Sequence, residues 1–294
     1  MEYAIALDLG GTAIKAGVYD TTGHQHAVLQ IPTPQPAAPD LVLLALADLI
    51  EHLDPKRLAP RVGIGVPGVT DRAGRVVKTA INLHQWHHVP LAEQIEQLTR
   101  RATVTGNDAN CAGLGEAWLG AARGVADALV LTLGTGVGGA VILEGRFFVG
   151  YNGAGAELGH IGLNMAGPPC NCGSQGCLEQ YVSAPAITRW AGQNPFLLGQ
   201  LARQGDPVAL AQWEQMGRYL GAGLSSLVYI FTPQMIVIGG GVAASHQFFL
   251  PSALAELERR VLLPCRVGLT LCPALLGNDA GIAGAARLAF QTFP

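Results

Sequence analysis

Near its N-terminus the chain reads Tyr3-Ala-Ile-Ala-Leu-Asp-Leu-Gly-Gly-Thr12, and a second apolar run follows from Ile14 to Val18. Apolar runs on either side of paired glycines predict two strands joined by a tight turn, here Asp8-Leu-Gly-Gly11. We expect Gly10 and Gly11 to supply the positive φ angles that such a turn needs. The chain is therefore predicted to open with a β-hairpin.

The same arrangement occurs again almost half a chain later. Leu129 to Leu133 is an apolar strand, Gly134-Thr-Gly-Val-Gly-Gly139 is a glycine loop, and Ala140 to Leu143 is a second strand-like run. Recurrence of one unit within a chain indicates a duplicated architecture. We therefore predict two similar sheets that face each other across a cleft.

Strands and helices alternate through most of the remaining sequence, which predicts an α/β protein. Proline in a first helical turn and asparagine at a cap mark helix starts, whereas short apolar runs mark strands. The expected elements are a helix over 40–52, a strand over 62–66, a helix opened by Pro90, a short strand to Thr105, a helix from about Asn107, a mainly helical region to about Phe231, a strand over 235–238 and a helix over 279–290.

The composition is that of a globular protein and excludes several classes. The 294 residues suffice for two ordinary domains, and 49% of them are hydrophobic against 13% charged. A net charge of −3 gives no basic surface, so no nucleic-acid partner is expected. Since no apolar run reaches the length of a membrane span and no signal-peptide pattern is visible, we expect a cytoplasmic protein without a membrane partner.

The two glycine loops are candidates for binding phosphate. The Gly134–Gly139 loop resembles a dinucleotide fingerprint, but that fingerprint needs a helix after the glycines, and a β-branched run follows here. A Walker A loop is excluded because none of the three lysines follows a glycine. Glycine loops in hairpins can still present backbone N–H groups to phosphate oxygens. Either loop alone could be a simple turn, whereas the pair favours phosphate binding.

Two similar segments place a carboxylate at a helix start, Asn107-Asp-Ala-Asn110 and Asn278-Asp-Ala-Gly281. Capping is the ordinary role for such residues, because asparagine caps the first turn and the helix dipole favours a carboxylate. The functional alternative is that Asp108, at the end of a strand, accepts the proton of a hydroxyl group that attacks phosphorus. The spacing alone does not distinguish Asp108 from Asp279.

A cysteine cluster follows a histidine in Glu157-Leu-Gly-His160 and Cys170-Asn-Cys-Gly-Ser-Gln-Gly-Cys-Leu-Glu179. Disulfides are not expected in a reducing compartment, whereas one imidazole and three thiolates form the ligand set of a tetrahedral zinc site. Four protein ligands leave no open position, so Zn²⁺ should stiffen the loop rather than activate water. The predicted ligands are His160, Cys170, Cys172 and Cys177. The other cysteines, Cys111, Cys265 and Cys272, are predicted to be small buried residues.

Together these motifs resemble those of the ROK family of sugar kinases, and most of all its bacterial glucokinases. The resemblance spans nearly the whole chain and rests on motifs in the family's order: Asp8-Leu-Gly-Gly-Thr12, Gly65-Val-Pro-Gly68, Asn107-Asp-Ala-Asn110, Gly134-Thr-Gly-Val-Gly-Gly139, Glu157-Leu-Gly-His160 and the C-x-C-G-x-x-G-C-x-E segment. It implies two actin-like, ribonuclease H-like α/β domains flanking a catalytic cleft. The smaller would comprise residues 1–107 and about 282–294, and the larger 108–281 with the zinc loop 157–179.

The resemblance also implies an activity, ATP-dependent phosphorylation of a hexose at its 6-hydroxyl, most simply glucose to glucose 6-phosphate. Asp108 would be the general base, which decides against Asp279. The sugar would be held by Gly68, Asn107, Asp108, Glu157, His160 and Glu179. ATP and Mg²⁺ would be held by Asp8, Gly10, Gly11, Thr12, Thr135, Gly136, Gly239, Gly240 and Gly241. His160 would bind zinc with one ring nitrogen and face the sugar with the other.

One position departs from the family, because Ala13 stands where many relatives carry lysine. The first strand begins at Tyr3, so we expect no helix-turn-helix and an enzyme rather than a repressor. The alternatives left open are a kinase for N-acetylmannosamine, fructose or allose, a polyphosphate-dependent kinase, and a sugar-sensing protein without turnover. The family also implies a homo-oligomer, either a dimer or a tetramer.

Overall fold

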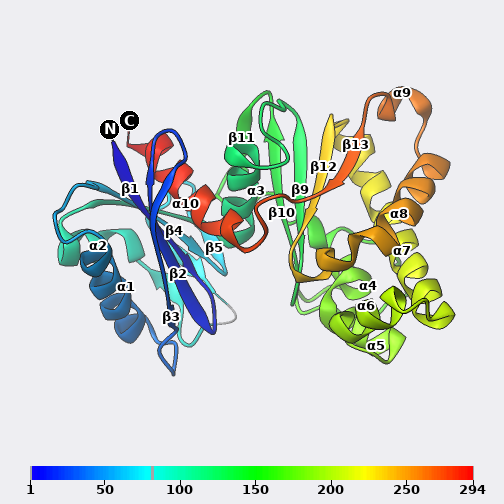
Figure 1. Ribbon diagram of the computed structural model, residues 1–294, viewed down its shortest axis with the longest axis horizontal. Helices are drawn as coiled ribbons and strands as arrows, with labels where there is room; N and C mark the ends of the chain where they lie inside the picture. Colours follow the sequence, from blue (N-terminus) through cyan, green and yellow to red (C-terminus); the bar gives the residue numbers. More distant parts are fainter. Residues whose placement is uncertain (1, 81–82, 294) are drawn as a thin grey trace. The chain divides into compact units, whose positions relative to one another are not determined.

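The computed structural model describes residues 2–80 and 83–293, and the chain forms two compact units (Figure 1). The first unit comprises residues 1–124, 147–156 and 278–294, and the second comprises 125–146 and 157–277. The sequence-based division began the second domain at Asp108. In the structure the helix that begins there packs on the C-terminal helix and lies in the first unit.

The first unit is built on a five-stranded sheet in the order β3-β2-β1-β4-β8. Its strands are β1 (Tyr3–Leu9), β2 (Ala13–Asp20), β3 (Gln25–Pro32), β4 (Arg61–Val66) and β8 (Ala102–Asn107). The first three strands form an antiparallel meander, whereas β4 runs parallel to both β1 and β8. Asp8 pairs with Lys15 on one side and Gly65 on the other, so these residues form a row across the sheet.

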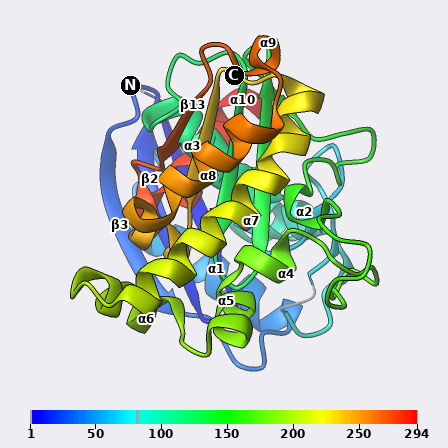
Figure 2. The ribbon, with the colours of Figure 1, turned by 90° about the vertical axis from the view of Figure 1, so that its right-hand side faces the viewer.

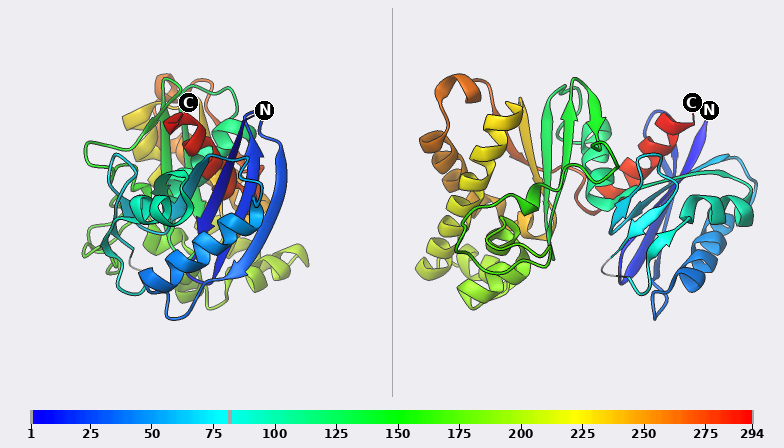
Figure 3. Two further views of the ribbon diagram at one scale, coloured as in Figure 1. Left: turned by 90° about the vertical axis from the view of Figure 1, so that its left-hand side faces the viewer. Right: turned by 180° about the vertical axis from the view of Figure 1, so that it is seen from behind.

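Helices cover both faces of this sheet, and the side chains of β1 explain how (Figure 3). Its large residues, such as Ile5 and Leu7, belong to the core cluster shared with α1 (Pro39–Leu53) and α2 (Leu91–Thr99). The opposite face carries small residues, and α10 (Ala280–Thr292) packs there together with α3 (Asp108–Leu119). A Cβ at Gly63 would lie 1.9 Å from the Ala285 carbonyl oxygen, so α10 touches the sheet backbone to backbone.

A second, three-stranded antiparallel sheet completes the first unit. Its strands are β5 (Val69–Thr70), β6 (Val77–Thr79) and β7 (His87–Val89). Residues 147–156 pack beside it: Lys78 Nζ donates to the Asn152 carbonyl over 2.6 Å, and a Cβ at Gly153 would lie 2.5 Å from the Thr70 carbonyl oxygen. These contacts place this segment in the first unit.

The second unit is built on β10, β9, β12 and β13, which belong to a sheet in the order β11-β10-β9-β12-β13. Its strands are β9 (Ala128–Leu133), β10 (Val137–Leu143), β11 (Arg146–Phe148), β12 (Met235–Gly239) and β13 (Thr270–Pro273). The pair β9 and β10 is antiparallel, and β12 runs parallel to both of its neighbours. The same arrangement of a hairpin followed by two parallel strands occurs in the first sheet, which confirms the predicted duplication.

Helices make up most of the rest of the second unit. They are η1 (Leu158–His160), α4 (Glu179–Val182), α5 (Ala184–Ala191), α6 (Pro195–Arg203), α7 (Pro207–Phe231), η2 (Gly241–Ser245), α8 (His246–Arg260) and α9 (Leu263–Arg266). Figure 2 shows α7 and α8 lying side by side, an approach that the small residues Gly217 and Gly221 of α7 allow. Among the described residues, no helix has the length and apolar character needed to cross a membrane.

The helices and strands expected from the sequence are present, and α1, β4, β12 and α10 have bounds within a residue or two of those predicted. The explanation offered for the first turn is wrong, because neither Gly10 nor Gly11 has a positive φ angle. Gly10 is needed for space instead: its N–H donates to the Ala13 carbonyl, and a Cβ would lie 2.8 Å from that oxygen.

The hairpin between β2 and β3 is closed by the buried carboxylate of Asp20. This carboxylate accepts hydrogen bonds from the Thr22 hydroxyl, from the backbone N–H groups of Thr22 and His24, and from His26 Nε2 at 2.7 Å. The Thr22 hydroxyl, followed by His26, holds the pKa of Asp20 well below its ordinary value. The folded hairpin therefore stabilises the ionised form of Asp20 relative to the protonated form.

Replacing Asp20 should destabilise the first unit in a pH-dependent way. A carboxyl group whose folded pKa is depressed contributes stability above its unfolded pKa of about 3.9 and loses it as pH falls toward the folded value. We expect Asp20→Asn to lower the denaturant midpoint at pH 7, and the gap to the wild type to shrink below about pH 4. Asp48→Asn, on the exposed side of α1, is the matched control. A gap that stays constant with pH would contradict this account.

Candidate functional site

The half-buried carboxylate of Asp8 lies near the end of β1, where glycines leave room for it. A Cβ at Gly281 would lie 2.5 Å from Asp8 Oδ2, and one at Gly65 would lie 3.6 Å from Oδ1. Burial raises the pKa of Asp8, and the charge of Lys15 opposes that rise. A carboxylate oxygen held among small residues is the kind of ligand that Mg²⁺ uses in proteins.

Lys15 connects this carboxylate to the start of α10. Its ammonium group forms an ion pair with Asp279 and donates to the Asn278 carbonyl over 3.2 Å. Asp279 is thus engaged by a cation, which weighs against its use as a general base. This contact could not be predicted from local patterns, because its partners are 264 positions apart in the chain.

In the turn after Asp8 the backbone carbonyl groups accept hydrogen bonds, whereas two of the backbone N–H groups make none. Thr33 N and Oγ1 donate to the carbonyls of Thr12 and Gly10, and Gln35 Nε2 donates to that of Gly11. The N–H groups of Gly11 and Thr12 make no hydrogen bond within the described residues. Such amides can receive an anion. The N–H of Gly10, in contrast, is already used inside the turn.

Asn107 clamps the start of α3 to the loop that follows β4. Its Oδ1 accepts from Asn110 N at 3.0 Å, which is the predicted helix cap, and its Nδ2 donates to the Gly68 carbonyl at 3.0 Å. Gly68 must be glycine, because a Cβ there would lie 2.1 Å from the Thr79 carbonyl oxygen. Asp108, the next residue, therefore stands on a turn that is fixed from two sides.

Cys111 lies under this turn, close to the carboxylates of Asp8 and Asp108. Burial raises the pKa of its thiol, and the charges of Asp8 and Asp108 raise it further, so the thiol is neutral and unreactive. Its prediction as a small buried residue is confirmed. The same prediction is wrong for Cys265 and Cys272, which are only half-buried because α9 and the edge strand β13 lie near the surface.

The predicted metal ligands of the second unit come together. The ligand atoms of His160, Cys170, Cys172 and Cys177 all lie within 4.8 Å of one another. A tetrahedral zinc ion with Zn–S bonds of about 2.3 Å requires about 3.8 Å between two sulfurs and about 3.6 Å between sulfur and nitrogen. Cys172 Sγ and Cys177 Sγ are 3.7 Å apart, and Cys170 Sγ is 3.6 Å from His160 Nδ1. The donor set and its spacing fit Zn²⁺.

Glu179 joins the cysteine loop to the glycine loop of the second sheet. Its Oε1 lies 3.8 Å from Cys170 Sγ, and its Oε2 accepts from Val137 N at 2.9 Å. Gly136 makes room for it, since a Cβ there would lie 2.7 Å from Oε2. The Val137 amide therefore fixes one carboxylate oxygen, although the two residues are 42 positions apart, and the other oxygen lies beside the cysteine cluster.

The glycine loop itself repeats the pattern of the first hairpin. The Gly134 carbonyl accepts from Ala184 N, and the Gly136 carbonyl accepts from Gly134 N. The N–H groups of Thr135 and Gly136 make no hydrogen bond within the described residues. Each unit thus offers two adjacent amides at the tip of its first hairpin.

The remaining predicted residues surround these loops. His160 ends η1 and directs Nδ1 to the cysteines, so its Nε2 is left for another partner, while Glu157 lies exposed before η1. Parallel pairing of β12 with β9 puts Gly239 opposite Thr132, close in the strand to the Gly134 loop. Of the three glycines at 239–241, Gly240 alone has a positive φ angle, and a Cβ there would lie 2.3 Å from the Leu133 carbonyl oxygen.

Comparison with known proteins extends the similarity over both units. A sequence profile of the ROK family matches residues 4–292. A glucokinase from Thermotoga maritima is 34% identical, with 97% of this chain and 96% of the relative covered. The crystal structure of a ROK family glucokinase from Streptomyces griseus in complex with glucose and AMPPNP is 34% identical with a TM-score of 0.85, covering 98% and 99%. That of a ROK hexokinase from Thermus thermophilus is 36% identical with a TM-score of 0.85, covering 98% of each chain.

The cysteine cluster leads to a prediction about metal content. We expect about one zinc ion per purified chain, and Cys172→Ala should lose most of it because one thiolate is missing. The same change should lower the melting temperature and expose the loop 161–178 to protease. Elemental analysis and limited proteolysis measure both effects. Cys265→Ala, which removes a thiol outside the cluster, should retain the metal, and equal zinc in the two variants would contradict the assignment.

Proposed function

The chain belongs to the ROK family, and from this membership we propose that it is an ATP-dependent hexose kinase whose acceptor is glucose. The observation that carries the proposal is its similarity, over nearly the full length, to glucokinases, one of them solved with glucose and AMPPNP. In the reaction the 6-oxygen of glucose forms a bond to the γ-phosphorus, the bond to the bridging oxygen breaks, and ADP leaves.

Asp108 is the general base in this proposal and accepts the 6-hydroxyl proton as the oxygen attacks. Its support is local: it stands on the first turn of α3, which Asn107 holds through Asn110 and Gly68. A rigidly held base matters because a protein catalyses phosphoryl transfer largely by positioning the reacting groups. The competing carboxylate, Asp279, is paired with Lys15.

The sugar ligands in this proposal are Gly68, Asn107, Asp108, Glu157, His160 and Glu179. His160 has Nε2 available when Nδ1 binds the metal, and Glu179 accepts from the Val137 N–H with one oxygen while its other oxygen lies 3.8 Å from Cys170 Sγ. The zinc ion, when bound, supplies rigidity to the loop that carries these two side chains. It leaves no position for substrate, so the sugar contacts only protein groups.

The nucleotide ligands are the hairpin tips and the glycines after β12. The amides of Gly11, Thr12, Thr135 and Gly136 are assigned to the phosphates, since they are the amides that the two turns leave unbonded. Gly10 shapes its turn, Gly239, Gly240 and Gly241 lie beside the adenosine, and Asp8 helps to hold Mg²⁺. We also place the protein in the cytoplasm, as a homodimer or homotetramer.

The experiment that tests the activity is ATP-dependent phosphorylation of a sugar panel: glucose, mannose, fructose, allose, N-acetylglucosamine and N-acetylmannosamine. Glucose should give the highest kcat/KM. Turnover on another sugar would keep the kinase and replace its acceptor, and faster turnover with polyphosphate would replace the donor. Sugar binding without turnover on any member would refute the kinase and favour a sugar-sensing protein.

The role of Asp108 is tested by replacing it and its rival with the matching amides. Asp108→Asn should lower kcat by about 10²- to 10⁴-fold, the usual contribution of a general base, while glucose still binds. Asp279→Asn, the matched control, should lower kcat by less than about tenfold. Steady-state kinetics and calorimetric glucose titration give the two quantities. A larger loss in Asp279→Asn than in Asp108→Asn would reverse the assignment.

Removal of the metal should weaken sugar binding more than nucleotide binding. Because the cysteine loop positions His160 and Glu179, chelation should raise the KM for glucose by about 10- to 100-fold, as loss of supporting contacts commonly does. The KM for ATP should change far less. Addition of Zn²⁺ to the chelated enzyme should restore the original KM, and an unchanged glucose KM in metal-free enzyme would separate the loop from the sugar site.

A further inference from the structure

Lys15 connects the strands that carry Asp8 to the residues that begin α10. Its side chain is 22% exposed, and its ammonium group forms an ion pair with Asp279 and donates to the Asn278 carbonyl over 3.2 Å. In the pairing of β1 with β2, Lys15 stands directly opposite Asp8. Residues directly opposite each other in an antiparallel pair project from the same face of the sheet. Lys15 and Asp8 therefore both face α10.

The start of α10 is held by this lysine rather than by a helix cap. Asp279 occupies the N-cap position, where an aspartate ordinarily accepts a hydrogen bond from an N–H of the first turn. Its side chain makes no such bond. Within the residues that the structure describes, the Lys15 ammonium is the sole hydrogen-bond donor to this carboxylate. The residues before α10 are thus tied to the sheet through Lys15.

The carboxylate of Asp8 depends on this helix start because no hydrogen bond orients it. In the part of the chain that the structure describes, it accepts none. Its oxygens lie instead between two glycine backbones: a Cβ at Gly281 would lie 2.5 Å from Oδ2, and one at Gly65 would lie 3.6 Å from Oδ1. A carboxylate confined only by packing keeps its direction only while those backbones stay in place. The position of Gly281 therefore controls that of the carboxylate.

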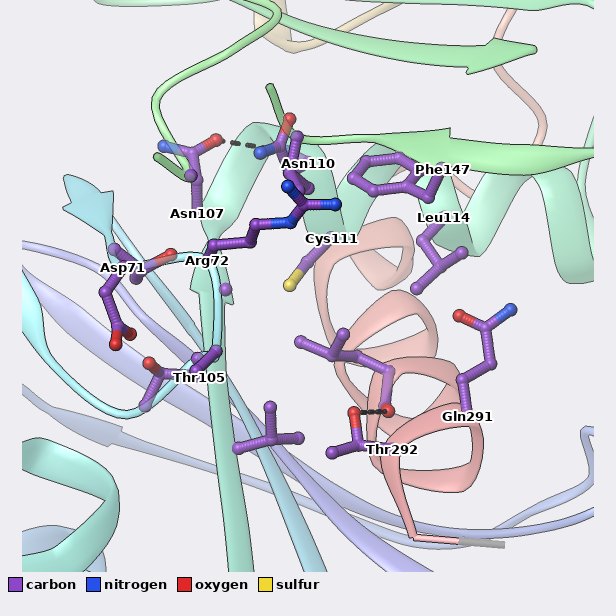
Figure 4. A pocket seen from close by; sticks show the side chains of 18 residues that line it. Asp71, Arg72, Thr105, Asn107, Asn110, Cys111, Leu114, Phe147, Gln291 and Thr292 are labelled. Carbon is purple, nitrogen blue, oxygen red and sulfur yellow. Dashed lines mark hydrogen bonds between the residues drawn. The ribbon is translucent and has the colours of Figure 1, made fainter. Parts of the chain in front are cut away.

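Two contacts fix α10 to the sheet on either side of Gly281. One is the Lys15 contact before the helix, and the other is the Ala285 carbonyl, which would lie 1.9 Å from a Cβ at Gly63. Farther along, the last turns of α10 border a cavity of about 290 Å³ whose lining includes Thr292 (Figure 4). That end of the helix is less tightly packed. Loss of the Lys15 contact would leave one of the two constraints nearest to Asp8.

We propose that Lys15 is a positioning residue for the magnesium–nucleotide complex. By binding Asn278 and Asp279 it holds the start of α10, so that Gly281 confines the carboxylate of Asp8 in the direction that the cation requires. The inference rests on the proposed kinase function and adds a residue to it. Lys15 itself need not touch the nucleotide.

A lysine that attracted the phosphates directly would have a different role, and the two roles predict opposite effects of replacing Asp279. If Lys15 acts by holding α10, Asp279→Asn removes its partner and weakens nucleotide binding. If Lys15 acts as a free cation, the same change removes a competing negative charge and strengthens nucleotide binding. The observed geometry favours the first role, because the ammonium group already has two acceptors on consecutive residues of the chain.

The test is calorimetric titration of the full-length chain with ADP in the presence of Mg²⁺, which needs no turnover. Lys15→Met keeps the aliphatic stem, and it and Asp279→Asn should each raise the Kd about fivefold, the upper range for a partly exposed ion pair. The double variant should bind no more weakly than either single one, because both remove the same contact. Lys15→Arg should stay within about twofold of the wild type.

Controls separate this role from general damage to the fold. Lys56→Met removes an exposed lysine of the first unit and should leave the Kd for ADP unchanged. The Kd for glucose should be unchanged in Lys15→Met. Tighter ADP binding by Asp279→Asn, additive losses in the double variant, or equal losses for ADP and glucose would each overturn the proposal. A wild type that binds no ADP would refute the kinase itself and this role with it.

The contact with α10 has a readout that is independent of nucleotide. Hydrogen exchange followed by mass spectrometry over residues 276–286 should be faster in Lys15→Met and in Asp279→Asn than in the wild type, because the start of the helix opens more often. Lys56→Met should exchange as the wild type does. Unchanged exchange in both contact variants would reject the positioning role even if their affinity for ADP falls.

Discussion

The packing of the first unit depends on glycines, which have no side chain, at the positions where α10 contacts the sheet and α3. A Cβ at Gly63 of β4 would lie 1.9 Å from a carbonyl oxygen of α10, one at Gly284 would lie 1.6 Å from a carbonyl of α3, and one at Gly115 would lie 2.2 Å from a carbonyl of α10. The last helix of the chain can therefore sit between the first sheet and α3 with backbone contact on both sides. Because close-packed interiors move little, this contact fixes Asp8 and the turn of Asp108 relative to each other.

The second unit reaches a comparable rigidity by a different route. Its glycine loop is held by Ala184 N, which donates to the Gly134 carbonyl, and by Glu179, whose carboxylate accepts from the Val137 amide and lies beside the cysteine cluster. Gly159 brings η1 onto the same strand, since a Cβ there would lie 2.2 Å from the Val137 carbonyl oxygen. Hydrogen bonds to the loop and the close approach of η1 thus take the place of the helix packing seen in the first unit. A loop of exposed polar residues has no core of its own, so metal ligation is a direct way to order it.

The sequence predicted the duplicated α/β architecture, most helices and the four metal ligands, because those features depend on local patterns. Apolar runs beside glycines located both hairpins, and the cysteine spacing located the cluster. Contacts between distant segments could not be predicted from the sequence. The pairing of Lys15 with Asp279 and of Glu179 with Val137 depends on how whole elements pack. The first turn is another case that local patterns do not explain. Gly10 is needed there because a Cβ would collide with the Ala13 carbonyl oxygen, and not because of its φ angle.

The small number of basic residues constrains how this chain can bind a triphosphate. It has three lysines, and one of them, Lys15, forms an ion pair with Asp279. With Asp8, Lys15 and Asp279 all ionised, this group carries one net negative charge, which favours a divalent cation over a bare phosphate beside it. Backbone amides are the groups proposed for the phosphates, and each hairpin tip keeps two of them unbonded while its carbonyls accept other hydrogen bonds. Fixed backbone dipoles need no rearrangement when charge develops, so a glycine turn with bonded carbonyls can replace a flexible lysine.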